Sequence, residues 1–453
     1  MRRIFTLFII AISLGLFVYI YEIEGDKKRE EKKNFNESLF KIKNDDIKSV
    51  TLKNHSQIIK YIKDDNLWKI TKPFNLSVDK NNIDLQINTF VNSKIKRKIG
   101  LADELNLINY GLGLSNIELL IETFEGHKIN FEIGNESASK GDLFVFNKDS
   151  NSVILSSNEL KNQVLKTLFE LRDKKIIHFD KSNVNQISII TENDSVVIEN
   201  QDKANQFWRI TSHNLFADNS QIDNYLNSLN RYNAIDFIDN PSKNEKSYFK
   251  NSSVSIILYL GTDLTKKTLT IGKSKIIDSD TNHYGFESGK SNIFLISDEN
   301  KKSLMKDHFY FQDKKLINYN ENDIKEINIL GAHKLSVINE DSLGWYISLD
   351  STIKLEKSDM NRLFSAINGI QAVEFLQYDD QESFGFNEPF IEVLINNSQQ
   401  NEMGLRIGNS DNSLNRYVKS INSERIYKAT NNSIERLTNL INELKGVENT
   451  EEL

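Results

Sequence analysis

The chain repeats itself at an interval of about 140 residues, and this repeat limits the folds that it can adopt. Each of its three tryptophans stands in a closely similar phrase, LWKIT around Trp68, FWRIT around Trp208 and GWYIS around Trp345. The tryptophans are separated by 140 and 137 residues. A fixed period of this kind indicates that one structural unit has been copied along the chain. In a chain of 453 residues, each copy is long enough to bury a core of its own.

Other landmarks keep the same spacing. An Ile-Gly pair recurs at residues 133–134, 271–272 and 407–408, and an Asp-Lys-Lys run occurs at 173–175 and 313–315. The phrase Tyr110-Gly111-Leu112 returns as Phe384-Gly385-Phe386, whereas the middle copy, near Phe249, lacks the glycine. These landmarks predict three modules, which comprise residues 36–174, 175–314 and 315–446.

The same order of elements is expected in each module. In the first, alternation of apolar and polar residues predicts strands over residues 49–52, 58–62 and 67–71, then 117–121, 128–133, 143–146 and 153–155. A helix is expected after Asp79, and a second one over residues 158–172. Most connections between strands are too short for crossovers, so the sheets should be antiparallel. The predicted fold class is α+β, with a βββ-α-ββββ-α order in each module.

The first helix of each module shows the repeat most clearly. Apolar residues follow an acidic residue at offsets of 4, 8 and 11, which lie on one face of a helix. An acidic side chain at the start of a helix suits both the N-cap and the helix dipole. The three series are Asp79 with Ile83, Ile87 and Phe90; Asp218 with Ile222, Leu226 and Leu229; and Glu356 with Met360, Phe364 and Ile367.

The N-terminus predicts a membrane anchor. Residues 4–21 contain no charged side chain, and a helix of that length is about 27 Å long, close to the roughly 30 Å hydrocarbon core of a bilayer. Residues 17–24 offer no small-x-small cleavage motif, so we expect a retained anchor over residues 1–25 rather than a removed signal peptide. A charged linker over residues 26–35 should follow, and residues 447–453 form a short acidic tail.

The charges beside the anchor leave its orientation open. Five basic residues follow the span, at positions 27, 28, 29, 32 and 33, and a count of basic residues alone would keep that side in the cytoplasm. A three-residue tail that carries Arg2 and Arg3 instead usually stays inside. We favour the second orientation, in which residues 36–453 lie outside the cytoplasm.

Composition excludes several classes of protein. The chain has no cysteine, which excludes disulfides, thiolate metal sites, cysteine nucleophiles and a lipid-modified cysteine. Its net charge of −7, from 57 basic and 64 acidic side chains, gives no basic excess of the kind that nucleic-acid binding requires.

No motif predicts a catalytic, cofactor or metal site. Gly272-Lys273-Ser274 resembles the end of a phosphate-binding loop, but Lys267 stands where the loop needs its first glycine. Asp278-x-Asp280-x-Asn282 opens like a calcium loop but lacks the turn glycine and the closing glutamate. The histidines are scattered, with no HExxH motif and no position shared between modules: His55, His127, His178, His213, His283, His308 and His333. We therefore predict no catalytic residue, cofactor or metal ligand, and assign no binding residue.

The three tryptophans allow two interpretations. Each lies in an alternating strand pattern, where a large aromatic ring can fill the core of its module. Alternatively, the three indoles could form a set of rings on which ligands stack. We favour the core.

These motifs together resemble a bacterial family known as domain-of-unknown-function family 4340. The resemblance rests on the Trp-x-Ile phrases, the aromatic-Gly-apolar phrases at 110–112 and 384–386, and the Ile-Gly phrases, and it covers about residues 40–440. Two departures are the missing glycine near Phe249 and a proline after the tryptophan in the first module alone, at Pro73. The resemblance implies no catalytic residues. It implies an extracytoplasmic partner of an ABC-type export permease or of gliding-motility auxiliary proteins.

The function expected from the sequence is that of an accessory subunit without catalytic activity. It would be anchored once in the bacterial inner membrane, with its bulk in the periplasm, and would bind an ABC-type permease or an auxiliary subunit. Two alternatives remain open. One is a stand-alone scaffold or adhesin of the cell envelope, and the other is an enzyme whose site the sequence does not reveal.

Overall fold

The computed structural model describes residues 33–446 except for residues 36, 55–56, 116, 139–140, 251–253, 341, 377–382 and 412–413, together with residues 12, 15, 17 and 19. The predicted anchor, residues 4–21, therefore lies outside the described residues apart from those four, as do most of the linker and the tail 447–453. Among the residues that are described, no helix is both long enough and apolar enough to span a membrane.

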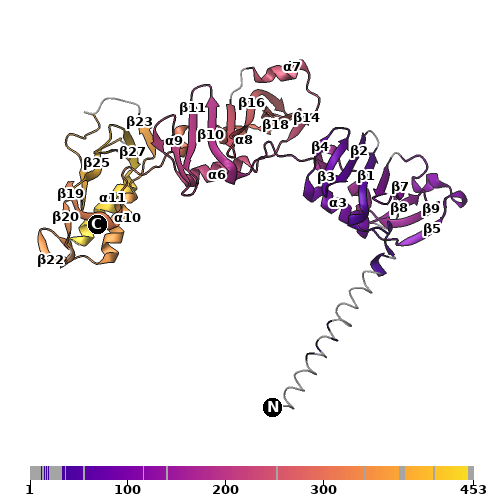
Figure 1. The fold of residues 1–453 in the computed structure, drawn as a ribbon, viewed down its shortest axis with the longest axis horizontal. Coiled ribbons are helices and arrows are strands. Elements are labelled where there is room, and N and C mark those ends of the chain that lie inside the picture. Colours follow the sequence, from indigo (N-terminus) through magenta and orange to yellow (C-terminus); the bar gives the residue numbers. More distant parts are fainter. Residues whose placement is uncertain are drawn as a thin grey trace, which may run out of the picture. The chain divides into compact units, whose positions relative to one another are not determined.

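The described residues form three antiparallel sheets that share one strand order (Figure 1). Counting the strands of each module from 1 to 9, the order is 4-3-2-1-6-7-8-9-5 in all three sheets. The first four strands make one half of the sheet, the sixth pairs with the first, and the fifth returns to the far edge beside the ninth. This confirms the predicted α+β class and the three repeated sheet-and-helix modules. The module boundaries at 174/175 and 314/315 stay predictions.

The elements of the first module are β1 (Ile47–Asn54), β2 (Gln57–Asp64), β3 (Leu67–Lys72), β4 (Leu76–Ser77), α3 (Lys80–Asn92), β5 (Arg97–Leu101), β6 (Glu118–Thr123), β7 (Lys128–Glu136), β8 (Asp142–Asn147), β9 (Ser152–Ser157), α4 (Glu159–Val164) and α5 (Leu168–Leu171). The middle module has β10 (Val184–Thr191), β11 (Ser195–Asp202), β12 (Phe207–Ile210), β13 (Leu215–Phe216), α6 (Asn219–Leu229), β14 (Asp236–Ile238), α7 (Lys243–Lys246), β15 (Val254–Leu260), β16 (Thr265–Ile277), β17 (Asp280–Glu287), β18 (Ile293–Ser297), α8 (Asp298–Leu304) and α9 (His308–Phe311).

The third module has β19 (Ile324–Gly331), β20 (Leu335–Glu340), β21 (Gly344–Ile347), β22 (Asp350–Lys354), α10 (Lys357–Asn368), β23 (Glu374–Leu376), β24 (Ile391–Asn397), β25 (Glu402–Ser410), β26 (Asn415–Ser420), β27 (Ile426–Thr430) and α11 (Asn431–Leu444). By compactness, the chain divides into two units. One comprises Met1–His178, Arg231–Tyr248 and Ser274–Ser297, and the other Phe179–Asn230, Phe249–Lys273 and Asp298–Leu453. Segments of the middle module thus belong to both units.

The acidic residues predicted to start the first helices are their N-caps. Asp79 Oδ1 accepts a hydrogen bond from the Asn82 backbone N–H at 3.1 Å, and Asp218 Oδ1 accepts one from Ser220 at 2.8 Å. At Glu356, the cap of α10, the backbone N–H instead donates to Asp359 Oδ2 at 3.0 Å. All nine apolar residues at offsets 4, 8 and 11 are buried, as predicted.

The first and third modules each contain a separate apolar core. In the first, residues from β1, β2, β6, β7 and β8 pack against α3, and the Phe40 ring meets Phe131 edge to face at 4.8 Å. In the third, α10 and α11 bury their apolar faces against β19, β20, β24 and β25. Burial of these faces removes apolar surface from water, and this stabilises each module.

The structure adds three features to the predicted order. Two short strands are additional: β4 lies at one edge of the first sheet and β5 at the other. Equivalent strands occupy the edges of the other two sheets. The helix predicted over residues 158–172 is two helices, α4 and α5. The N-cap of the second helix is Thr167, whose side chain accepts a hydrogen bond from the Glu170 backbone N–H while the Glu170 carboxylate accepts one from the Thr167 N–H.

Candidate functional site

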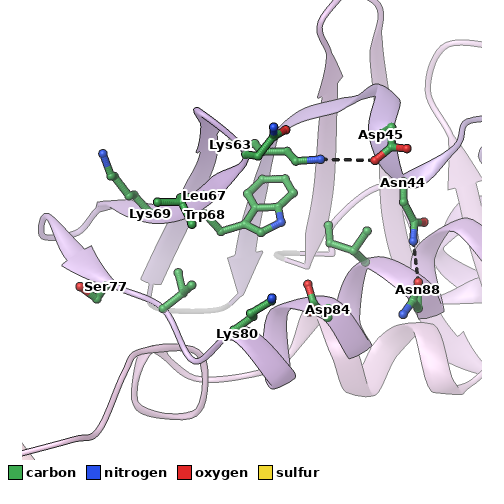
Figure 2. Close-up of a pocket in the computed structure, with 13 residues that line it drawn as sticks. Asn44, Asp45, Lys63, Leu67, Trp68, Lys69, Ser77, Lys80, Asp84 and Asn88 are labelled. Carbon is green, nitrogen blue, oxygen red and sulfur yellow. Dashed lines mark hydrogen bonds and ion pairs between the residues drawn. The ribbon is translucent and has the colours of Figure 1, made fainter. Parts of the chain in front are cut away.

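A hollow of about 600 Å³ opens in the first module between the hairpin of β2 and β3 and the helix α3 (Figure 2). The 3₁₀ turn η2 (Asn44–Asp46), which precedes β1, forms its rim on one side. The lining residues are Asn44, Asp45, Lys63, Asn66, Leu67, Trp68, Lys69, Ser77, Val78, Lys80, Asp84, Ile87 and Asn88.

Trp68 is the large apolar side chain at the centre of this hollow (Figure 2). It is half-buried, and its indole meets the fully buried Tyr61 ring edge to face at 5.3 Å. The Tyr61 hydroxyl is held in turn by Gln86 Oε1 at 2.5 Å, so strand β2 and helix α3 fix the ring behind the indole. Trp68 therefore contributes to the core and to the hollow at once.

The other two tryptophans are buried to different extents, so the predicted core role fits one of them better than the other. Trp208 is buried, with 6% of its surface exposed. Trp345 is half-buried and packs against the core of the third module, where it meets Phe364 edge to face at 6.2 Å. The core interpretation is confirmed for Trp208, and the other two rings are partly buried and pack against the cores of their modules.

The rim of the hollow is polar and carries both signs of charge. Lys63 Nζ lies 3.6 Å from Asp45 Oδ1, and Asn44 Nδ2 donates to Asn88 Oδ1 at 2.6 Å (Figure 2). These two contacts join the 3₁₀ turn to the hairpin on one side and to α3 on the other. Lys80 and Asp84, both exposed on α3, complete the rim on the helix side.

The middle module bridges the corresponding position with an ion pair. Lys181 stands three residues before β10, as Asn44 does before β1, and Asp223 stands five residues after its helix cap, as Asp84 does. Lys181 Nζ and Asp223 Oδ2 lie 3.0 Å apart. With asparagine in place of this lysine, Asp84 has no ion-pair partner among the described residues and faces the hollow.

A second group of polar residues lies in the unit that contains the third module. Asp194, His213 and His308 bring one potential ligand atom each to within 4.8 Å of one another, the one such group of three within the described part of the chain. Burial lowers the pKa of His213, the charges of His308 and Arg425 lower it further, and Asp194 opposes them. Sequence reasoning missed this group because its members are separated by 19 and 95 residues and follow no ligand spacing.

The remaining histidines do not join this group. His178 pairs with Asp173, His127 lies 3.8 Å from Glu125, and His333 Nδ1 lies 3.3 Å from Asn442 Oδ1. His283, on β17, is buried, and His55 lies outside the described residues. Of the six histidines that the structure describes, it thus brings together His213 and His308.

The strand order and the repeated tryptophan phrases define the chain as an α+β protein of tandem modules. The family model described as "Domain of unknown function (DUF4340)" matches it twice, over residues 68–252 and 208–389. Each match begins at a repeat tryptophan and runs past the next one, and together they cover more than two thirds of the chain. The chain belongs to the DUF4340 family, and the suspected resemblance is confirmed. No curated protein and no solved structure matches it.

Proposed function

We propose that this chain is an accessory subunit without catalytic activity, anchored in the bacterial inner membrane by residues 4–21, with its modules in the periplasm. Its partner would be an integral membrane protein, namely an ABC-type export permease or an auxiliary subunit of that complex. The class of partner comes from the family resemblance, and the architecture supports a binding role.

The observation that carries the proposal is what the three modules have in common. They share the sheet order, the buried helix faces and the tryptophan phrases, all of which build cores. Copies of one scaffold on one chain present several related surfaces, and several weak contacts on one chain raise the total affinity for a large partner. A single predicted span cannot form a channel, so a transport role would require other membrane subunits.

The hollow at Trp68 supplies a contact surface for such a partner. Half-buried aromatic rings surrounded by polar side chains are typical of recognition surfaces, because the ring gives apolar area and the rim gives direction. Lys80 and Asp84 are exposed on its rim, so charge reversal there should disturb binding without disturbing the core.

The location is tested by fusing alkaline phosphatase and a cytoplasm-dependent fluorescent protein to the C-terminus. We expect an active phosphatase and a dark fluorescent protein. The opposite pattern would place the modules in the cytoplasm and refute this part of the proposal.

The partner is tested by mild extraction from the native membrane and affinity purification of the full chain. We expect a permease or auxiliary subunit to be recovered with the chain, and the Lys80→Glu/Asp84→Lys variant to recover less of it. Glu159→Lys, an exposed charge reversal on α4 of the same module, is the matched control. Recovery of the chain alone, with a turnover activity that one substitution abolishes, would overturn the proposal.

A further inference from the structure

We propose that Asp194, His213 and His308 form a binding site for one divalent transition-metal ion of the zinc class. The site is separate from the Trp68 hollow, and it does not depend on the accessory role proposed above. Three side chains from distant segments converge there, one buried ring nitrogen has no hydrogen-bond partner among the described residues, and neighbouring groups orient the ligands.

The three residues come from separate segments of one unit. Asp194 lies in the turn between β10 and β11, His213 in the turn between β12 and β13, and His308 is the first residue of α9. Their side chains are partly buried, with 33%, 27% and 19% of their surfaces exposed. An ion can therefore reach them from solvent, while the surrounding protein limits their movement.

The ligand atoms are close to the separations that coordination needs. His213 Nε2 lies 3.7 Å from Asp194 Oδ1, and His308 Nδ1 lies 3.6 Å from Asp194 Oδ2. Two ligand atoms that each lie about 2.1 Å from a tetrahedral zinc ion are about 3.4 Å apart. The two carboxylate–imidazole distances exceed this value by only a few tenths of an ångström, but they involve different carboxylate oxygens. The three potential ligand atoms lie within 4.8 Å of one another, so the side chains must still close around an ion. Two imidazoles and one carboxylate are a ligand set that zinc and its neighbours accept.

The His308 nitrogen that faces the carboxylate is unsatisfied. Nδ1 is buried and has no hydrogen-bond partner in the described structure. Its 3.6 Å distance to Asp194 Oδ2 is too long for a hydrogen bond. Buried ring nitrogens are rarely left without a partner. A bound cation would satisfy this atom and neutralise the carboxylate at the same time.

Neighbouring groups orient the other two ligands. His213 Nδ1 lies 2.8 Å from Ser212 Oγ, so a proton on Nδ1 leaves the Nε2 lone pair facing Asp194. The Ser195 backbone N–H donates to Asp194 Oδ1 at 2.7 Å and fixes the carboxylate. Hydrogen bonds of this kind, one step away from the ion, set the ring tautomer and raise metal affinity.

Two features have to be overcome on binding. The imidazoles are stacked, with centroids 4.0 Å apart and planes 14° apart, and parallel rings cannot both aim an in-plane lone pair at one ion. One ring must therefore rotate out of the stack. In addition, the Arg425 guanidinium donates to the His213 carbonyl oxygen at 3.1 Å, so its positive charge lies near the site. We therefore expect an affinity below that of a site with three compact, uncrowded ligands.

The position gives the ion a structural consequence. His308 also meets the Phe375 ring of β23 edge to face at 6.3 Å. Arg425 precedes β27, and both of these residues belong to the third module. An ion held by Asp194, His213 and His308 would tie two hairpin turns to α9 next to these contacts. Binding to the folded chain alone should raise its thermal stability as the metal concentration rises.

The probe is zinc chloride, added to the purified full chain after treatment with a chelator and dialysis. Competition with a chromogenic chelator should show one ion bound per chain. Asp194→Asn, His213→Gln and His308→Gln should each weaken binding more than about tenfold, because loss of a ligand costs at least as much as loss of a group that orients one. Cobalt in place of zinc should give the visible absorption of a four-coordinate ion.

Two controls separate a site from surface binding and from misfolding. His127→Gln removes an exposed histidine of the first module, 75% of which is accessible, and should leave zinc affinity unchanged. Asp194→Asn retains an oxygen that can accept the Ser195 hydrogen bond, so its melting temperature without metal should match that of the parent chain. Absence of saturable binding by the parent chain would overturn the proposal. So would binding that persists unchanged in a folded Asp194→Asn variant.

Discussion

Arg172, the residue after α5, forms a two-pronged ion pair with Asp239, which follows β14. Nη1 donates to Oδ2 at 2.9 Å and Nη2 lies 2.8 Å from Oδ1, and the side chains are 4% and 12% exposed. The same guanidinium lies 3.6 Å from the centre of the Phe237 ring. Arg172 thus joins the end of the first module to residues 231–248 within one compact unit.

The next junction places a different side chain at the same position. Gln312, like Arg172, stands one residue before an Asp-Lys-Lys run, and its Nε2 donates to the Tyr427 hydroxyl at 3.0 Å. At both junctions the first lysine of the run lies over a phenylalanine five residues earlier, Lys174 over Phe169 and Lys314 over Phe309. The repeated run therefore makes the same lysine–phenylalanine contact at both predicted module junctions.

The Arg172–Asp239 pair predicts a large loss of stability when one partner is removed. Asp239→Ala leaves the guanidinium buried without a counter-charge, which typically costs about 3–5 kcal/mol of unfolding free energy. Urea unfolding followed by circular dichroism measures the loss. Arg172→Met/Asp239→Ala should recover most of it, because no charge then stays buried.

The control is the solvent-exposed ion pair between Lys69 and Asp64. Lys69 and Asp64 lie 3.2 Å apart but are 57% and 58% exposed, so Asp64→Ala should cost less than about 1 kcal/mol. Equal losses of unfolding free energy at the two sites would contradict the structure, in which the Arg172–Asp239 pair is shielded from solvent.

The tryptophans predict a graded series. Trp208→Ala should cost about 3–5 kcal/mol, because the ring is 6% exposed and its removal leaves a cavity. Trp68→Ala and Trp345→Ala should cost less, because part of each ring is already in solvent. Chains that retain one tryptophan allow an independent check by acrylamide quenching, in which Trp208 should be the least accessible. Equal quenching of all three would contradict the series.

Local patterns predicted the elements that depend on local residues. The predictions of the caps Asp79 and Asp218 and of the buried helix faces were correct, because the 3.6-residue period of a helix can be recognised within one segment of the sequence. The strand β5 was missed because the phrase RKIGL has no alternation and exists as a strand through its pairing with β9. The break between α4 and α5 could have been found, since Thr167-x-x-Glu170 is a capping box.

The candidate sites required the fold. Asp194, His213 and His308 converge through strand pairings that no fixed spacing records. The feature that distinguishes the Trp68 hollow appears only when the modules are compared. Asn44 stands where the middle module has Lys181, which pairs with Asp223. Side chains distant in the sequence meet only through tertiary structure, so single-sequence reasoning assigned no binding residue.

The backbone conformation and close surroundings of Gly111 explain why glycine is a landmark of the repeat. Its φ is +69°, and a Cβ there would lie 2.4 Å from Asn135 Cγ. Gly385 and Asn409 show the same relation in the third module. The middle module has Phe249 and Lys273 at these two positions, so glycine and asparagine are absent together. Gly111→Ala should destabilise the first module by the roughly 1 kcal/mol that a positive φ costs alanine, together with a smaller cost for turning the exposed Asn135 side chain aside.

The matched control for that substitution is Gly126→Ala. Gly126 also has a positive φ, +88°, but a Cβ added there would meet nothing within 4 Å, so only the backbone cost applies. Thermal unfolding of both variants separates the steric contribution from the backbone contribution. A Gly111→Ala loss no larger than that of Gly126→Ala would refute the packing of Gly111 against Asn135.

Glu118 on β6 predicts a pH-dependent contribution to stability. Burial alone would raise the pKa of its carboxyl, but the hydrogen bond from Lys148 at 2.8 Å and the charges of Lys148 and Lys53 outweigh it and hold the pKa below its usual value. A carboxyl with a lowered pKa in the folded state stabilises the fold above its unfolded pKa, about 4.3 for glutamate. That contribution is lost as the pH falls through the folded-state pKa.

Glu118→Gln should therefore be less stable than the parent chain at pH 7, with a difference that stays constant down to about pH 5 and shrinks below about pH 4.3. Urea midpoints over a pH series measure it. Because the carboxylate is 27% exposed, solvent screens the ion pairs, and raised salt should reduce the difference further. Glu104→Gln, at an exposed position of the same module, controls for the loss of one negative charge. A difference that persists unchanged into acid would assign the effect of Glu118→Gln to packing rather than to charge.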